Sequence, residues 1–381
     1  FQAEDGIRDS VASRGLGDVY KRQDQTFMMA IGELTIEQFF AGLYAHTDIN
    51  FDPMSAGRQM GGHFVTHSLD ENFNWKDLTK QKNSSSDISP TAAQMPRLLG
   101  LAQASKVYKN IKGFDASKFS NEGNEVAWGT IGNASTSEGI FFETINAAGV
   151  LQVPMVISVW DDDYGISVHA KHQTTKENIS KILEGFQRDE EDAGYEILNV
   201  KGWDYPALVN CYEKAGQIAR LEHVPVLVHV EELTQPQGHS TSGSHERYKK
   251  TERLQWEKKN DCNLKFRQWI ISNNIASEDE LFDIEKDIKL KVKAGKTKAW
   301  DDFINPIKVD ADYVISLMHA AAKASSQKSF IEKEIAKLEA IKKPIKKDIL
   351  GVSRDVLKLS LIHISEPTRR YAISYAVFCL K

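Results

Sequence analysis

Cysteine, long apolar runs and an excess of basic charge are scarce or missing in this chain of 381 residues. Its three cysteines, Cys211, Cys262 and Cys379, stand far apart and lack the paired spacing of metal or redox motifs. This usage argues against a disulfide framework and favours a reducing cytoplasm. No apolar run approaches the length of a membrane-spanning helix, and the formal net charge of −5 argues against a chain-wide footprint for nucleic acid.

Both ends of the chain differ in character from the rest. Residues 1–23 and residues 359–381 resemble translated sequencing-adapter DNA rather than any protein family. We therefore expect the native sequence to be an internal piece of a longer protein, confined to residues 24–358. A natural disordered tail is the alternative interpretation.

Strand-like and helix-like segments alternate through the middle of the chain. This alternation predicts an α/β fold, with a doubly wound, mostly parallel sheet flanked by helices. The expected strands are 153–159, 195–200 and 225–230, and the expected helices are 36–44, one following Pro96, 141–148, 176–192 and 205–222.

The composition changes beyond Thr251 to charged helix formers, which predicts a helical C-terminal extension. Within it, residues 326–343 form a helical pattern that Pro344 stops. The apolar positions of this pattern fall on one stripe and are Ile331, Ile335, Leu338 and Ile341. We expect a connecting helix packed on a neighbour rather than a binding motif.

Two polar turns flank one helix–strand segment of the alternating region. The first is Gly132-Asn133-Ala134-Ser135, and the second is Asp161-Asp162-Asp163-Tyr164, with 26 residues between Ala134 and Asp161. A glycine-bounded turn ahead of a helix leaves backbone amides free to bind phosphate, and the second turn offers oxygen ligands. Both turns should lie at the same edge of a parallel sheet, so the sequence predicts a split diphosphate and metal site there. An ordinary glycine turn, or a relic that binds nothing, is the alternative.

These turns resemble the signature of the alpha, decarboxylating subunits of the 2-oxo acid dehydrogenase complexes, which bind thiamine diphosphate through Mg²⁺. That signature is Gly-Asp-Gly, about two dozen residues, and then Asn-Asn. Here Gly132-Asn133-Ala134 fills the first slot and Asp161-Asp162 fills the second. The resemblance implies that Asn133, Asp162 and the backbone carbonyl of Tyr164 bind Mg²⁺, with Gly132, Ala134 and Ser135 at the cofactor. The exchange of acid and amide between the slots leaves one ligand carboxylate, which octahedral Mg²⁺ tolerates.

Three further stretches agree with the resemblance, which covers residues 24–250 and fades afterwards. Gly57-Arg58-Gln59-Met60 with His63 resembles a family stretch. His63 is either an active-site donor or a structural histidine, and Arg58 is either a charge clamp or, as is more frequent for arginine, the surface partner of a nearby acid. The segment 89–96 is similar to the one whose backbone meets the aminopyrimidine ring, and Thr91 is the matching position.

The third stretch, Gly238-His239-Ser240-Thr241-Ser242, resembles the family loop whose histidine sits beside the cofactor diphosphate. The resemblance implies that His239 binds the diphosphate and carries a proton when the acyl group passes to the lipoyl group. A loop histidine without a role is the alternative. By this resemblance the chain divides into adapter-like residues 1–23, a thiamine-diphosphate domain at 24–250, a helical extension and linker at 251–358, and adapter-like residues 359–381.

The resemblance implies oxidative decarboxylation of a small 2-oxo acid, with acyl transfer to the lipoyl group of a transacylase. Branched-chain acids such as 3-methyl-2-oxobutanoate rank ahead of pyruvate, because the stretches around Arg58 and Thr91 read closer to the branched-chain members. In the family a beta subunit supplies the carboxylate that activates the cofactor. We therefore expect a site shared with a beta subunit, or with a beta-like region of the intact protein, in a heterotetramer, and inactivity of this chain alone.

Three alternatives stay open beside that function. They are a pyruvate dehydrogenase alpha subunit, a structural or binding subunit that has lost catalysis, and a transketolase-like transferase. Asn133 and Ala134, in place of Asp and Gly, motivate the second alternative. No nucleic acid or membrane partner is expected.

Overall fold

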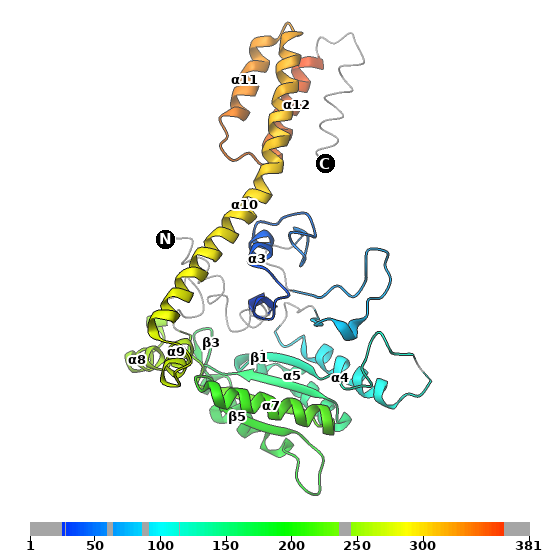
Figure 1. Ribbon diagram of the computed structural model, residues 1–381, viewed down its shortest axis with the longest axis vertical. Coiled ribbons are helices and arrows are strands. Elements are labelled where there is room, and N and C mark those ends of the chain that lie inside the picture. Colours follow the sequence, from blue (N-terminus) through cyan, green and yellow to red (C-terminus); the bar gives the residue numbers. More distant parts are fainter. Residues whose placement is uncertain are drawn as a thin grey trace. The chain divides into compact units, whose positions relative to one another are not determined.

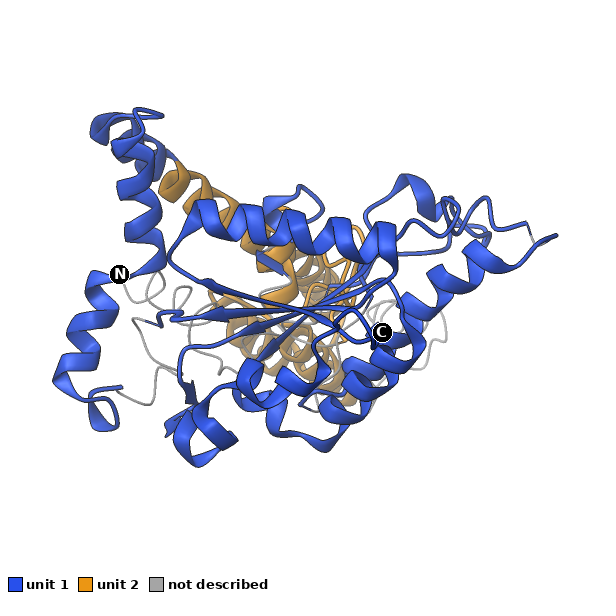
Figure 2. Ribbon diagram, turned by 90° about the horizontal axis from the view of Figure 1, so that it is seen from below, with its two compact units in different colours: residues 1–34, 63–287 blue, residues 35–62, 288–381 orange. Residues whose placement is uncertain are grey.

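The computed structural model describes residues 25–26, 28–58, 64–85, 91–113, 115–235 and 245–361, with side chains placed up to residue 359. The chain forms two compact units. One comprises residues 1–34 and 63–287, and the other residues 35–62 and 288–381 (Figure 2). The first unit thus continues past Lys250, and the domain boundaries expected from the sequence stay a prediction.

A four-stranded sheet forms the centre of the first unit (Figure 1). Its spatial order is β1-β2-β6-β5, and every neighbouring pair is parallel. Both central strands, β2 and β6, are buried at all but their last residue, which explains why their buried positions are apolar apart from Ser158 and His229. The strands are β1 (Ala127–Gly132), β2 (Met155–Trp160), β5 (Glu196–Lys201) and β6 (Val226–Glu231).

Helices cover both faces of this sheet (Figure 2). On one face, α4 (Met95–Asn110) and α5 (Gly139–Leu151) pack on alternate residues of β2 such as Met155 and Ile157. On the other face, α7 (Tyr205–Glu222) packs on the intervening Val156. Successive side chains of a strand point to opposite faces, so one strand supplies both cores. The doubly wound α/β fold expected from the sequence is confirmed.

Short elements complete the first unit. They are η1 (Leu78–Lys80), η2 (Ala134–Ser137), β3 (Tyr164–Gly165), β4 (Val168–His169), η3 (Ala170–His172), η6 (His245–Arg247), α8 (Thr251–Lys259) and α9 (Cys262–Ser272). The two strands β3 and β4 form a small antiparallel pair.

The prediction of one helix over residues 176–192 is wrong for most of that range, which contains only short helical turns. Lys176 and Glu177 have φ values of 59° and 56°, and this left-handed backbone interrupts a right-handed helix. Asn178 then starts a new turn, because its side chain accepts a hydrogen bond from the amide of Lys181. The segment consists of η4 (Thr175–Glu177), α6 (Ile179–Ile182) and η5 (Leu183–Phe186).

The second unit is helical. Its elements are α3 (Ile36–Leu43), the later part of α10 (Glu278–Lys323), α11 (Lys328–Glu339) and α12 (Lys346–Leu361). Ile331, Ile335 and Leu338 of α11 are buried in a core shared with α10 and α12, so the predicted stripe packs on neighbouring helices. Among the residues that the structure describes, no helix has the length and apolarity needed to cross a bilayer.

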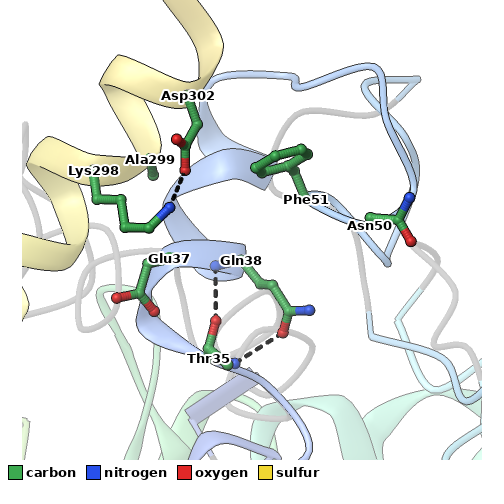
Figure 3. Close-up of a pocket in the computed structure, with 8 residues that line it drawn as sticks. All are labelled: Thr35, Glu37, Gln38, Asn50, Phe51, Lys298, Ala299 and Asp302. Carbon is green, nitrogen blue, oxygen red and sulfur yellow. Dashed lines mark hydrogen bonds and ion pairs between the residues drawn. The ribbon is translucent and has the colours of Figure 1, made fainter.

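A pocket of about 270 Å³ lies in the second unit, between α3, the segment that follows it, and α10 (Figure 3). Its polar groups are partly paired among themselves, since Lys298 binds Asp302 and Thr35 exchanges two hydrogen bonds with Gln38. The lining residues are Thr35, Glu37, Gln38, Asn50, Phe51, Lys298, Ala299 and Asp302. None of them is a residue that the sequence analysis assigns to the cofactor.

Candidate functional site

The two polar turns expected to form the site lie beside each other. In the parallel pair of β1 and β2, Gly132 is in register with Trp160, and the amide of Asn133 donates to the Trp160 carbonyl at 3.1 Å. Asn133 therefore leaves β1 where Asp161 leaves β2. The carboxyl edge of the sheet thus brings together two segments that are separated by a helix and a strand.

Two buried side-chain oxygens at this edge have no hydrogen-bond partner among the residues that the structure describes. Asn133 is 5% exposed and Asp162 is 2% exposed. Asn133 Oδ1 and Asp162 Oδ2 accept no hydrogen bond from the described part of the chain, whereas Asp162 Oδ1 accepts one from the amide of Tyr164 at 3.1 Å. Buried oxygens nearly always have a partner, so this pair indicates a missing donor or cation.

The chemistry of these oxygens fits Mg²⁺. One carboxylate oxygen, one amide oxygen and a backbone carbonyl are the hard ligands that this ion prefers alongside phosphate and water. Within the described ranges, no three His, Cys, Asp or Glu side chains gather at a possible metal site. A cation at this edge would therefore depend on neutral oxygens as well as on the Asp162 carboxylate.

Burial raises the pKa of Asp162 to about 7. The positive charge of Lys249 opposes this shift, and that of Arg253 does so more weakly. The free carboxylate is thus held at an energetic cost, which a bound divalent cation would offset.

The two turns touch each other through Gly165. A methyl group at Gly165 would lie 2.5 Å from Ala134 Cβ and 2.4 Å from Gln173 Oε1. Ser137 Oγ also donates to the Gln173 carbonyl at 3.0 Å. We call residues 132–135, for which the sequence predicts diphosphate binding, the diphosphate turn, and residues 161–165, for which it predicts a cation, the metal turn. The two turns are packed so closely that a side chain at position 165 would force one of them to shift.

A buried polar network supports the start of the metal turn. His229 on β6 is fully buried, with Nε2 at 3.0 Å from Asp161 Oδ2 and Nδ1 at 3.0 Å from Ser180 Oγ. The other oxygen of Asp161 accepts the amide of Asp163 at 2.8 Å. His229 thereby fixes Asp161, and Asp161 fixes the turn that carries Asp162.

A buried ion pair lies against the ring of Tyr164. The Lys249 and Glu257 side chains are each 1% exposed, and they form an ion pair of 2.7 Å. Lys249 Nζ also lies 4.8 Å from the centroid of the Tyr164 ring. Neither these residues nor His229 carries a sequence signature of a site. The available signal is a charged or polar side chain inside an apolar pattern, as at His229 within Val226-Leu227-Val228-His229-Val230.

The remaining expected residues occupy different environments. Gly132 and Ser135 are buried at the first turn, whereas Thr91 is exposed in the turn before α4. That turn is tied to β1 by Gln94, whose amide donates to the Thr130 carbonyl at 3.4 Å. Their cofactor roles stay predictions.

Arg58 is exposed and donates to the Ser55 carbonyl at 3.3 Å. Several other expected residues lie outside the described residues, namely Gln59, Met60, His63, Ser89, Pro90 and His239 with its loop.

Comparison with known proteins identifies the family. The chain matches the family described as "Dehydrogenase E1 component" over residues 19–308, and it belongs to that family. It is 26% identical over 260 residues to the 2-oxoisovalerate dehydrogenase subunit alpha, mitochondrial, of Caenorhabditis elegans, covering 68% of this chain and 51% of that protein. It is also 26% identical over 255 residues to 2-oxoisovalerate dehydrogenase subunit alpha of Bacillus subtilis, covering 67% and 66%.

Relatives named for a second substrate match as well. The pyruvate dehydrogenase E1 component subunit alpha of Porphyra purpurea is 30% identical over 163 residues, covering 42% of this chain and 44% of that protein. The matched part of the chain covers between 44% and 66% of the length of these relatives. The family, rather than one substrate, is what the comparisons establish.

Proposed function

We propose that this member of the dehydrogenase E1 component family is the alpha subunit of a 2-oxo acid dehydrogenase complex. It would carry out thiamine-diphosphate-dependent decarboxylation of a branched-chain 2-oxo acid. The observation that carries this proposal is a pair of buried oxygens at the carboxyl edge of the sheet, Asn133 Oδ1 and Asp162 Oδ2, to which no described residue donates a hydrogen bond. They occur at the two positions where the family resemblance leads us to expect Mg²⁺ ligands.

Each residue of the site has a distinct role in this proposal. Asn133, Asp162 and the carbonyl of Tyr164 would hold Mg²⁺. The first amides of η2, at Ala134 and Ser135, would bind the diphosphate, because the first amides of a helix have no partner within it. Thiamine diphosphate, when bound, supplies the carbanion chemistry that releases CO₂ from a 2-oxo acid.

The surroundings of the site favour binding of charged groups. Burial of Asn133 and Asp162 lowers the local dielectric, so their oxygens interact more strongly with a cation than exposed oxygens would. The Thr91 backbone would contact the aminopyrimidine ring, and His239 would bind the diphosphate and move a proton during acyl transfer. A beta subunit would supply the activating carboxylate, and a transacylase would present the lipoyl acceptor.

The test of this proposal is Mg²⁺-dependent binding of thiamine diphosphate, measured by calorimetry on the chain assembled with its beta-type partner. Asp162→Ala should abolish binding, and Asp162→Asn should weaken it strongly because the one ligand carboxylate is lost. Asp189→Asn is the matched control, since this carboxylate also accepts backbone amides but lies in an exposed turn. Unchanged affinity in both Asp162 variants would contradict the proposed metal site, and absent binding in the wild type would favour a relic.

Substrate choice needs its own measurement. Branched-chain acids are the first candidate because of the stretches around Arg58 and Thr91, and pyruvate is the second because relatives of that name match as well. Comparing kcat/KM for 3-methyl-2-oxobutanoate and pyruvate, with an artificial electron acceptor, decides between them. A higher value for pyruvate would contradict the branched-chain assignment and leave the cofactor proposal intact.

A further inference from the structure

Arg253 of α8 reaches the metal turn from outside the sheet. Its Nη2 donates to the backbone carbonyl of Asp162 at 2.8 Å, and its Nη1 pairs with the carboxylate of Asp163. On its other side, Nε donates to Glu257 Oε1 at 2.9 Å. One rigid guanidinium group therefore joins two consecutive residues of the turn to a buried acid of the helix.

The backbone held by Arg253 has an unfavourable conformation. Asp163 has a φ of 69°, in the left-handed region that disfavours residues other than glycine. Its amide donates to Asp161 Oδ1 at 2.8 Å, and its carbonyl accepts from the Ala170 amide at 2.7 Å. The side chain adds a further restraint through Arg253, and this restraint comes from a different part of the chain.

Arg253 is itself fixed by its neighbours. Its side chain is 19% exposed, and the guanidinium carbon lies 4.8 Å from the Trp256 ring centroid and 5.6 Å from that of Tyr164. Glu257 Oε1, which accepts from Arg253, also accepts from the buried Lys249. The guanidinium thus has little freedom to follow a moving turn, so it is suited to hold the turn in place.

We propose that Arg253 is a positioning residue for the metal turn. By binding the Asp162 carbonyl and the Asp163 carboxylate, it holds the peptide segment that presents Asp162 Oδ2 and the Tyr164 carbonyl toward the cation. The inference rests on the proposed function for the identity of the ligand. The restraint itself is a property of the chain without any ligand.

Hydrogen exchange followed by mass spectrometry on the metal-free, full-length chain tests the restraint directly. The amides of Asp163 and Tyr164 report on the turn, because both donate to side-chain oxygens within it. In Arg253→Gln these amides should exchange roughly tenfold to a hundredfold faster, the effect expected for the loss of hydrogen bonds to charged groups. Arg253→Lys retains the charge without the fork, and it should give an intermediate rate.

Arg267→Gln is the matched control. Arg267 also lies in the first unit and binds two acids, with Nη2 at 2.8 Å from Glu278 Oε1 and Nη1 paired with Glu285, but it does not contact the turn. Exchange of the turn should stay at the wild-type rate in this variant. An unchanged rate in Arg253→Gln, or equal acceleration in both variants, would overturn the positioning role.

A second measurement separates this inference from the cofactor proposal. Mg²⁺ and thiamine diphosphate are added to the assembly with the partner subunit, and protection of the same turn is followed. The wild type should be protected, and Arg253→Gln should need at least about tenfold more ligand for equal protection, in proportion to its faster exchange. Absent protection in the wild type would count against the proposed cofactor, whereas the metal-free comparison decides the role of Arg253. Equal ligand requirements in both proteins would overturn that role.

Discussion

Replacing Gly165 by alanine is expected to force apart the two turns of the candidate site. The added methyl group would lie 2.5 Å from Ala134 Cβ and 2.4 Å from Gln173 Oε1. Ordinary contact between carbon atoms needs about 3.5 Å or more, so the approach to Ala134 Cβ is short by about 1 Å. The Gln173 side chain can rotate away. Ala134 Cβ cannot, because η2 follows directly from a strand in the sheet.

The overlap at Gly165 should affect both the unfolding free energy and catalysis. Overpacking of this kind costs about 1–3 kcal/mol of unfolding free energy. Relief by a backbone shift of about 1 Å would also misplace the metal turn relative to the diphosphate turn. A misplacement of that size costs catalysis on the order of a hundredfold. Gly165→Ala should therefore lower both stability and activity.

Urea denaturation measures the stability change, and calorimetry measures Mg²⁺-dependent binding of thiamine diphosphate to the assembly. Gly185→Ala is the matched control, because a methyl group there would meet no atom within 4 Å. Its unfolding free energy should stay within about 0.5 kcal/mol of the wild type.

Exchanging the two methyl groups gives the decisive variant. In Ala134→Gly/Gly165→Ala the methyl that blocks the added group is removed, so a large part of the lost stability and affinity should return. A single variant with wild-type stability and binding would refute the steric reasoning. Failure of the double variant to recover would show that Ala134 is not the obstacle.

Three other predictions follow from buried or proposed functional groups. Lys249→Met and Glu257→Gln should each lower the unfolding free energy by about 3–5 kcal/mol in chemical denaturation, because each leaves one buried charge without its partner. Lys249→Met/Glu257→Leu should lower it by less than the sum of the two single variants, and an additive loss would contradict this. Burial and the nearby Lys109 lower the pKa of His223 below its usual 6.5, so the unfolded chain binds a proton more readily than the folded chain. The unfolding free energy should therefore fall as the pH drops below about 6.5, and His223→Asn should abolish that part of the pH dependence. His239→Ala should depress overall complex activity far more than decarboxylation with an artificial electron acceptor, and equal losses would indicate a cofactor-binding role alone.

Short-range sequence signals predict the positions of many elements of the fold. The helix expected at 205–222 matches α7 at both ends, because Asp204 caps its first turn, Pro206 suits its start and His223 ends it in the left-handed region. The positions of β2 and β6 follow from their largely apolar runs in the same way. Both turns of the candidate site were also predictable, since parallel strands place their carboxyl ends at one edge of a sheet.

The supports of the metal turn were decided by the tertiary structure alone. Arg253 is 90 residues from Asp163 in the sequence, and His229 is 68 residues from Asp161. No periodicity or spacing links such pairs, because their contacts depend on where α8 packs and on which strand lies beside β2. The sequence by itself determined three of the four strands of the main sheet, the helices α3, α4, α5, α7 and α11 and the two polar turns, through short-range propensity and capping, whereas β1 was not expected. Only the folded chain determined which buried charges hold those turns, because burial and pairing over such distances arise from packing.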